Sequence, residues 1–217
     1  MVNIIGDQNS VFNQFISEIR DQTIQKDSMR FRRNIERMGE IMAYEISKTF
    51  TYEKCEITTP LGIASVSLAK EQPVIATILR AGLPLHQGVL NYFDRAENAF
   101  ISAYRKHHKN GTFDIQVEYL ASPDIADKEL ILCDPMIASG ASIALTYNAL
   151  LMRGKPKHTH LVCLIASTEG VEYVKKQLPE NVTIWCGAVD EELTAQAYIV
   201  PGLGDAGDLA FGKKFNN

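Results

Sequence analysis

A carboxylate and a loop of small residues follow a strand of the buried type. Residues 130–133 form a continuous apolar run, typical of a strand covered on both faces, and Asp134 ends that run. Small residues fill positions 138–142, and apolar side chains then recur at helical spacing over 143–153. A strand, a loop and a helix in this order direct unpaired backbone N–H groups and the positive end of a helix dipole at one point. The pattern predicts a phosphate site.

The carboxylate of Asp134 must serve a different group from the loop. An acid cannot help to hold phosphate, but it accepts hydrogen bonds from neighbouring hydroxyls, such as those of a sugar diol. A phosphate loop beside a diol acceptor predicts a pocket for ribose 5-phosphate. The loop lacks both Gly-Lys-Ser/Thr and the Gly-x-Gly-x-x-Gly spacing, so it is neither a Walker loop nor a dinucleotide fingerprint. For the loop taken alone, a strand-to-helix turn without any ligand remains the alternative.

Two arginines follow other apolar strands of the chain. Arg80 comes directly after residues 73–79, and Arg105 comes after residues 99–104. Predicted strands alternate with helices here, which favours a largely parallel sheet with its ligands at the carboxyl ends of the strands. Both guanidinium groups are then expected beside the phosphate loop, where they would bind phosphate oxygens bidentately. Surface charge is the alternative, but together the residues indicate a phosphorylated ribose that carries a diphosphate.

The other elements must position these groups. We expect helices over residues 11–20 and 28–48, and a hairpin over 51–69 that turns near Pro60-Leu61-Gly62. The core then continues with helices at about 85–93 and 169–178, and with a returning strand at 115–120. We predict a single domain in four consecutive parts: an N-terminal helical part (1–50), a hairpin arm (51–70), a core (71–187) and a C-terminal segment (188–217).

The C-terminal segment departs from the alternation of strands and helices. Residues 196–200 are a short strand candidate, and residues 201–208 are rich in glycine, which makes a helix or a regular strand costly there. Apolar neighbours such as Phe211 argue against a disordered tail. We therefore predict an ordered, irregular loop over 201–208 whose backbone approaches a ligand closely.

The composition limits the class of protein. The chain has 217 residues, of which 46% are hydrophobic, and a formal net charge of −4. One α/β domain of this size buries roughly 70% of its unfolded surface. The mild negative charge argues against a protein that coats nucleic acid or an anionic membrane.

The cysteines and the apolar runs indicate the compartment. The cysteines lie far apart and lack the paired spacing of a metal site, so we expect free thiols in a reducing compartment. The N-terminus has no basic and apolar leader, and no stretch approaches about 18 apolar residues. We therefore expect a cytoplasmic protein that is neither secreted nor membrane-spanning. The cysteines are Cys55, Cys133, Cys163 and Cys186.

Three segments resemble known enzymes. Residues 134–142, Asp-Pro-Met-Ile-Ala-Ser-Gly-Ala-Ser, resemble the phosphoribosyl-diphosphate (PRPP) signature of type I phosphoribosyltransferases. Residues 78–83 and 198–208 are similar to segments of the uracil phosphoribosyltransferase family, and the C-terminal segment is the most specific of them. With Phe31-Arg32 and Tyr104-Arg105, the resemblance extends over nearly the whole chain. It implies an α/β fold of the type I phosphoribosyltransferase kind: a mostly parallel sheet flanked by helices, with N-terminal helices, a β-hairpin arm and a C-terminal base-binding hood.

The resemblance also implies a role for each matching residue. Asp134 would hold the ribose hydroxyls, residues 138–142 the 5-phosphate, and Arg80 and Arg105 the diphosphate. The implied catalytic residues are Arg80, Arg105, Asp134 and Asp205. The implied PRPP-binding residues are Arg80, Arg105, Asp134, Pro135, Met136, Ile137, Ala138, Ser139, Gly140, Ala141, Ser142 and Asp205. Uracil would be read by Ile199, Gly204, Asp205 and Ala206, largely through backbone groups.

The implied reaction transfers the 5-phosphoribosyl group of PRPP to N1 of uracil and gives UMP and diphosphate, a step of pyrimidine salvage. Mg²⁺ is the expected cofactor, held mainly through the diphosphate rather than by protein ligands. The resemblance and the apolar stripe of helix 28–48 favour a homodimer or a larger homo-oligomer, and a GTP-like nucleotide activator is a further expectation. Nucleic-acid and membrane partners are not expected. Two alternatives remain: transfer to another base, and a PRPP-binding regulator without catalysis that binds RNA or protein.

The chain departs from the family pattern in two places. Ser139-Gly140-Ala141 stands where the family usually has Thr-Gly-Gly. The methyl group of Ala141 is tolerable at negative φ and would weaken PRPP binding at positive φ. The polar loop 106–113 also differs from the acidic version of the family, and His107 and His108 in it are weaker candidates for diphosphate contacts. We expect His86 to pack in its helix, and we expect no metal site at His158 and His160.

Overall fold

The computed structural model describes residues 1–107 and 113–214, and for residues 103–107 and 113–116 the description covers the backbone alone. An eight-stranded sheet forms the centre, in the order β1-β10-β9-β7-β4-β5-β6, with β8 paired to β9. All pairs in this sheet are parallel except β5 with β6, where the predicted returning strand runs antiparallel. The strands are β1 (Val2–Ile4), β4 (Val74–Leu79), β5 (Glu97–His107), β6 (Phe113–Ala121), β7 (Glu129–Cys133), β8 (Met136–Ile137), β9 (His158–Ser167) and β10 (Val182–Asp190).

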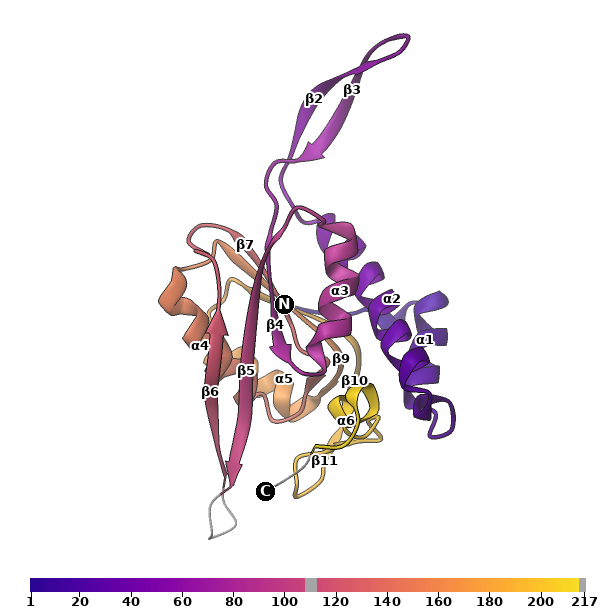
Figure 1. The fold of residues 1–217 in the computed structure, drawn as a ribbon, viewed down its shortest axis with the longest axis vertical. Coiled ribbons are helices and arrows are strands. Elements are labelled where there is room, and N and C mark those ends of the chain that lie inside the picture. Colours follow the sequence, from indigo (N-terminus) through magenta and orange to yellow (C-terminus); the bar gives the residue numbers. More distant parts are fainter. Residues whose placement is uncertain (108–112, 215–217) are drawn as a thin grey trace.

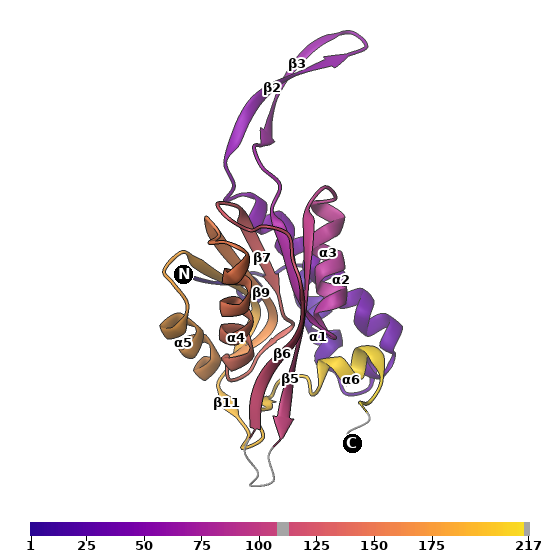
Figure 2. The same cartoon turned by 60° about the vertical axis from the view of Figure 1, so that its left-hand side comes forward.

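Helices cover both faces of the sheet (Figures 1 and 2). Successive strand residues point to opposite faces, so Ile75 joins one core cluster while Val74 and Ala76 join the other. The first cluster lies under α1 (Val11–Arg20), α2 (Ser28–Ser47), α3 (Gly82–Tyr92) and the short α6 (Ala206–Phe211), and the second lies under α4 (Ala141–Leu150) and α5 (Thr168–Gln177). Short 3₁₀ turns occupy η1 (Ile5–Asp7), η2 (Ile24–Lys26) and η3 (Leu151–Arg153). The predicted mostly parallel α/β fold is confirmed.

The helix after β4 begins earlier than the sequence suggested. It starts at Gly82 rather than near residue 85, with Pro84 inside its first turn. Proline is compatible with a first turn, because the N–H groups there have no partner within the helix. The proline therefore lies within the helix instead of preceding it.

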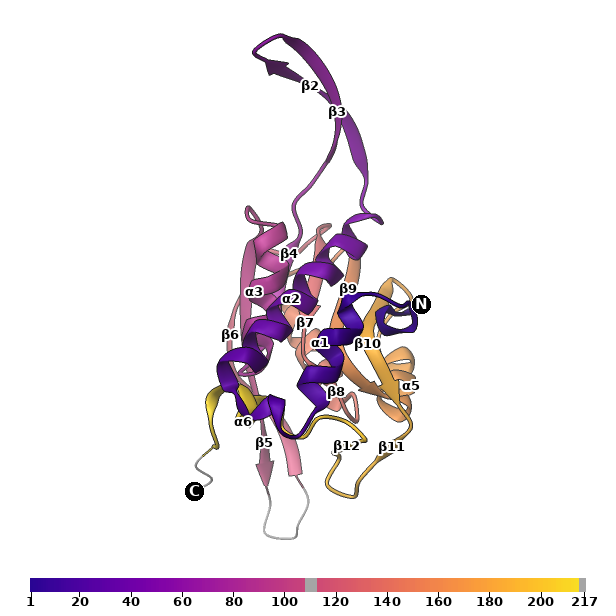
Figure 3. The same ribbon diagram turned by 90° about the vertical axis from the view of Figure 1, so that its right-hand side faces the viewer.

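A hairpin extends away from the body of the protein (Figures 1 and 3). It pairs β2 (Tyr52–Thr59) with β3 (Gly62–Ala69), and Thr59 lies opposite Gly62, so the turn falls where the sequence predicts it. Most residues of the hairpin are exposed, in contrast to the strands of the central sheet. Among the described helices, none combines the length and the apolar character that crossing a membrane requires.

The C-terminal segment lies at the end of the molecule opposite the hairpin (Figure 1). It contains the two-residue strands β11 (Glu192–Leu193) and β12 (Ile199–Val200), followed by α6. The prediction of an irregular loop over all of 201–208 was wrong in its last part, because α6 begins at Ala206. The Asp205 side chain caps this helix by accepting a hydrogen bond from the Asp208 N–H at 2.9 Å. The cap offsets the poor helix propensity of Gly207.

Candidate functional site

A cavity of about 840 Å³ lies at the carboxyl edge of the sheet. Three segments that are far apart in the sequence line it: the loop between β4 and α3, the loop between β7 and α4, and the segment before and within α6. Among the predicted site residues, those in the lining are Arg80, Asp134, Met136, Ile137, Ala138, Ser139, Gly140, Ser142, Ile199, Gly204, Asp205 and Ala206.

The loop before α4 has the conformation of a phosphate cradle. Gly140 takes the left-handed conformation, with φ of 76°, at the N-cap of α4. Ala141 is the first residue of this helix and is not among the non-glycine residues with positive φ. Its methyl group therefore fits the backbone, and the glycine that the loop requires is present one position earlier. The alanine in Ser139-Gly140-Ala141 therefore does not strain the backbone of the loop.

A neighbouring helix holds the cradle in place. Ser167 donates a hydrogen bond from its hydroxyl to the Ala138 carbonyl at 2.6 Å and accepts one from the Gly170 N–H at 2.8 Å. A Cβ at Gly170 would stand 2.1 Å from the Ala138 carbonyl oxygen, so the first turn of α5 packs directly on the loop. Sequence reasoning missed these supports, because Ser167 lies 29 residues from Ala138 and no local motif connects them.

Asp134 sits beside the cradle with few hydrogen-bond donors of its own. Its side chain is half-buried, and the one hydrogen bond that it accepts from the described residues comes from the Met136 N–H, which donates to Oδ1 at 3.3 Å. Burial raises the pKa of Asp134 to about 7, and the hydrogen bond from Met136 lowers it by a smaller amount. The hydroxyls of a diol would supply the missing donors and would favour the ionised carboxylate.

Arg80 reaches from the β4–α3 loop to the C-terminal helix. Its Nη2 lies 3.0 Å from Asp208 Oδ1, and its Nη1 donates to the Gly212 carbonyl at 3.2 Å. The Nε group is buried and has no partner within the described residues. The guanidinium group therefore connects the cavity wall to α6, and its Nε–H group is left to donate to a ligand. Asp208, which the sequence analysis did not single out, lies in the same C-terminal segment as Asp205.

The segment before α6 presents backbone groups to the cavity. Ile199, Leu203 and Ala206 are each at most 5% exposed and anchor the segment in the core under α2. Gly204 lies between two of these anchors and lines the cavity. Within the described chain, the peptide groups of Gly204 make no hydrogen bond. They are therefore available to a ligand.

Not every predicted site residue lines the cavity. Pro135 does not, and its carbonyl instead accepts hydrogen bonds from Leu164 and Ile165 of β9 at 2.9 and 3.2 Å. Ala141 is also absent from the lining. The backbone of Arg105 belongs to β5, at the same edge of the sheet, but its side chain lies outside the described residues, as does the side chain of His107. His108 lies wholly outside them.

The remaining histidines lie away from the cavity lining. His86 is buried and bonds Asn98 Oδ1 at 2.8 Å, and burial lowers its pKa, so the expected packing is confirmed. His160 is likewise buried; its Nδ1 accepts from Trp185 Nε1 at 3.1 Å, and its ring lies 4.7 Å from that of His158. Within the described ranges, no three His, Cys, Asp or Glu side chains are grouped to hold a metal ion.

A mostly parallel sheet with a strand-end acid and a helix-capped loop of small residues at its carboxyl edge defines the class of the type I phosphoribosyltransferases. The solved structure of the AQ2163 protein from Aquifex aeolicus has a similar fold, with a TM-score of 0.86 and 26% sequence identity over 98% of each chain. Residues 7–213 match the family model described as uracil phosphoribosyltransferase, and the chain belongs to this family.

Individual relatives agree with the family match. The chain is 57% identical to the uracil phosphoribosyltransferase of Porphyromonas gingivalis over 210 residues, which cover 97% of both chains. It is 37% identical to that of Pyrococcus furiosus over 203 residues, covering 92% of this chain and 85% of the relative. The resemblance inferred from the motifs is thereby confirmed across almost the whole length.

Proposed function

We propose that the protein transfers the 5-phosphoribosyl group of PRPP to N1 of uracil, giving UMP and diphosphate in pyrimidine salvage. One observation carries the proposal: a single cavity is lined by Asp134, by cradle residues 138–140 and 142, and by residues 199 and 204–206 of the C-terminal segment. Each of the three has a partner in the reaction, namely the 5-phosphate, the ribose hydroxyls and the base. Membership of the uracil phosphoribosyltransferase family supports the same reaction.

In this proposal PRPP is held at both ends. The N–H groups at the start of α4 bind the 5-phosphate, because the helix dipole and the unpaired amides favour an anion there. Asp134 accepts the ribose hydroxyls, and Arg80 and Arg105 bind the diphosphate. Guanidinium groups suit that task, since they offer several N–H donors in a planar arrangement and remain charged at any working pH.

The donor set of the cavity fits Mg²⁺ bound through the substrate. Mg²⁺ usually takes one or two carboxylates together with substrate phosphates and keeps several waters. The described part of the cavity offers the carboxylates of Asp134, Asp205 and Asp208, the last of which is paired with Arg80. No three ligating side chains are grouped within the described residues, so the diphosphate oxygens would be the main ligands. When bound, the ion supplies positive charge to the leaving diphosphate.

Uracil recognition rests on backbone groups in this proposal. The base presents an acceptor, a donor and a second acceptor along one edge, which the N–H and C=O groups of Ile199, Gly204 and Ala206 can match. Cytosine would turn its amino donor towards a backbone donor. An unmatched buried polar group costs about 1–3 kcal/mol, so a preference of at least about 10-fold for uracil is expected.

The bond between C1 of the ribose and the diphosphate oxygen breaks as N1 of uracil attacks from the opposite face. Positive charge develops on the ribose, and negative charge collects on the departing diphosphate. Arg80 and Arg105 stabilise that negative charge as it forms, which is how preorganised electrostatics lowers a barrier. The proton on N1 of uracil must also be lost, and Asp205 is the candidate residue for assisting this step.

A panel of bases tests the proposal. The protein is incubated with PRPP, Mg²⁺ and either uracil, cytosine, hypoxanthine or orotate, and diphosphate release is followed. We expect release with uracil and a rate at least about 10-fold lower with cytosine. Turnover with another base but not with uracil would favour a phosphoribosyltransferase for that base. Absence of turnover with every base would favour a PRPP-binding regulator without catalysis. Adding GTP to the uracil reaction tests the expected nucleotide activator.

The assembly and the compartment complete the proposal. The tip of the β2–β3 hairpin carries Leu61, fully exposed, and Ile63, 71% exposed, and an isolated two-stranded hairpin is marginally stable in water. The apolar stripe of helix 28–48 does not support an oligomer as expected, because it is buried in the core of the single chain. A second copy of the chain would instead cover the apolar surface of the hairpin, so we expect at least a homodimer. Sedimentation analysis of the wild-type protein and of Leu61→Ser/Ile63→Ser tests the expected homodimer, and a monomeric wild type would contradict it.

All four cysteines are free, in keeping with a reducing cytoplasm.

A further inference from the structure

One ion pair holds both peptide groups of Gly202. The Gly202 N–H donates to Asp190 Oδ2 at 2.9 Å, and the Gly202 carbonyl accepts from Arg20 Nη1 at 2.9 Å. Arg20 also donates from Nη1 and Nη2 to the two carboxylate oxygens of Asp190, at 2.8 and 2.7 Å. Side chains from the end of α1 and the end of β10 therefore fix the position and the orientation of a single peptide segment.

The pair is largely shielded from water. The side chain of Asp190 is 8% exposed and that of Arg20 is 21% exposed. Burial acts to raise the pKa of Asp190, but the hydrogen bonds from Arg20 and the Gly202 N–H outweigh it, so the pKa is lowered. The carboxylate is therefore ionised at neutral pH. A bidentate pair between charged groups is stronger and more directional than a single neutral hydrogen bond.

Gly202 lies between the residues that we propose to contact uracil. It lies between Ile199 and Gly204, which both line the cavity, although Gly202 itself does not. Its φ is 56°, and a Cβ at this position would stand 2.1 Å from the Ile199 carbonyl oxygen, so the chain folds tightly back here. A displacement of Gly202 would move the peptide groups on both sides of it.

The PRPP side of the cavity does not depend on the pair in the same way. Within the described residues, neither the Arg20 side chain nor the Asp190 side chain makes a hydrogen bond or an ion pair with residues 138–142 or with Arg80. Losing the pair should therefore disturb the base segment and leave the phosphate cradle in place.

We propose that Arg20 and Asp190 are positioning residues for uracil: their ion pair clamps Gly202 and thereby sets the spacing of the backbone groups that read the base. The proposal rests on the proposed function and deepens it. It assigns to the N-terminal helix α1 a role in base recognition, although α1 contributes no residue to the cavity lining.

Steady-state kinetics of two conservative variants tests the proposal. Arg20→Lys keeps the positive charge but loses the planar fork, and Asp190→Asn keeps the shape but loses the charge. We expect the KM for uracil to rise about 10-fold in both variants, since a buried backbone group loses its partner, and the KM for PRPP to stay within about 2-fold. A general loss of stability would not raise the KM for uracil while leaving the KM for PRPP unchanged.

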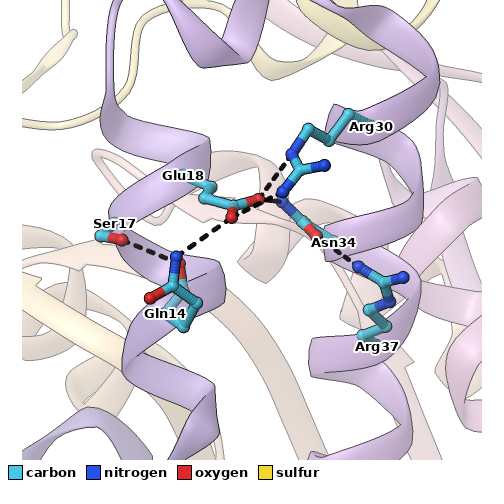
Figure 4. A network of polar contacts seen from close by, with 6 residues as sticks. All are labelled: Gln14, Ser17, Glu18, Arg30, Asn34 and Arg37. Atoms are coloured by element: carbon cyan, nitrogen blue, oxygen red, sulfur yellow. Dashed lines mark hydrogen bonds and ion pairs between the residues drawn. The ribbon is translucent and has the colours of Figure 1, made fainter.

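Arg30→Lys is the matched control. Arg30 also forms a bidentate pair, donating from Nε and Nη2 to Glu18 at 2.8 Å each, and it joins α2 to α1 (Figure 4). Its hydrogen bonds do not reach the base segment in the described structure. We expect this variant to keep the wild-type KM for both substrates.

Three results would overturn the inference while leaving the proposed function intact. They are an unchanged KM for uracil in a folded Arg20→Lys protein, an equal rise in both KM values, and the same change in Arg30→Lys. Arg20→Lys decides the question alone if Asp190→Asn does not fold, as judged by thermal unfolding. A wild-type protein that does not use uracil would refute the proposed function itself, before any variant is compared.

Discussion

Replacing Gly140 with alanine is expected to distort the phosphate cradle. An alanine at φ of 76° pays about 1–2 kcal/mol for the left-handed conformation. Its Cβ would also stand 2.9 Å from the Gly170 carbonyl oxygen and 3.0 Å from both Tyr173 Cδ1 and Val174 Cγ2. The backbone of Gly170 cannot yield easily, because its N–H is bonded to Ser167 at 2.8 Å.

The expected loss of stability follows from these two costs. Overpacking of this kind typically adds about 1–3 kcal/mol, so Gly140→Ala should destabilise the protein by about 3 kcal/mol in total. For a chain of this length that loss lowers the melting temperature by about 6–12 °C. Relief of the clash requires the cradle to move, so the KM for PRPP should rise at least about 10-fold through weakened N–H contacts to the 5-phosphate.

Ala141→Gly provides the matched control at the next position. Ala141 has a negative φ and begins α4, so this change should cost at most about 1 kcal/mol of helix propensity. Thermal unfolding and the KM for PRPP are measured for both variants. If Gly140→Ala were as stable and as active as Ala141→Gly, or if Ala141→Gly greatly improved PRPP binding, the assigned geometry of the cradle would be wrong.

Three further predictions concern charged groups. The pKa of Asp134 is raised to about 7, so its carboxyl must lose a proton before it can accept hydrogen bonds from two hydroxyls. As the pH falls below 7, the KM for PRPP should therefore rise, approaching about tenfold for each pH unit. The rise should be weaker in Asp134→Asn. The pKa of Glu18 is lowered to about 2, chiefly by the hydrogen bond from Arg30, so its stabilisation is complete above pH 4.5 and is lost towards pH 2. Glu18→Gln should therefore lower the unfolding free energy by about 2 kcal/mol at pH 7 and by much less at pH 2 in thermal scans; an equal loss at both would contradict this. Arg80→Gln should lower kcat/KM for PRPP at least about 100-fold with little change in melting temperature, and a wild-type rate would exclude the diphosphate role.

The sequence predicted the features that depend on local patterns. Apolar runs such as residues 130–133 marked the buried strands, and the alternation of strands with helices gave the parallel sheet. The hairpin turn after Thr59 followed from turn residues between two extended segments. These patterns are reliable because burial on one or both faces imposes its own period on the sequence.

The sequence could not predict the features that depend on long-range contacts. The clamp on Gly202 joins residues that are 182 and 12 positions away, and the Ser167 support of the cradle has no local motif. The helix α6 was missed for another reason: glycine propensity was weighed more heavily than the cap that Asp205 provides. Only the folded chain brings Arg80 and Asp208 together.

The most direct test of a single site for PRPP and uracil is chromatographic detection of UMP formed from uracil, PRPP and Mg²⁺. The wild-type protein is compared with Asp134→Asn, after thermal unfolding has shown that the two proteins are similarly stable. The site predicts that the wild-type protein forms UMP and releases one diphosphate for each UMP, and that Asp134→Asn is at least about 100-fold slower because it loses charge-assisted hydrogen bonds to the ribose. No UMP from the wild-type protein, or equal rates in the two proteins, would contradict it.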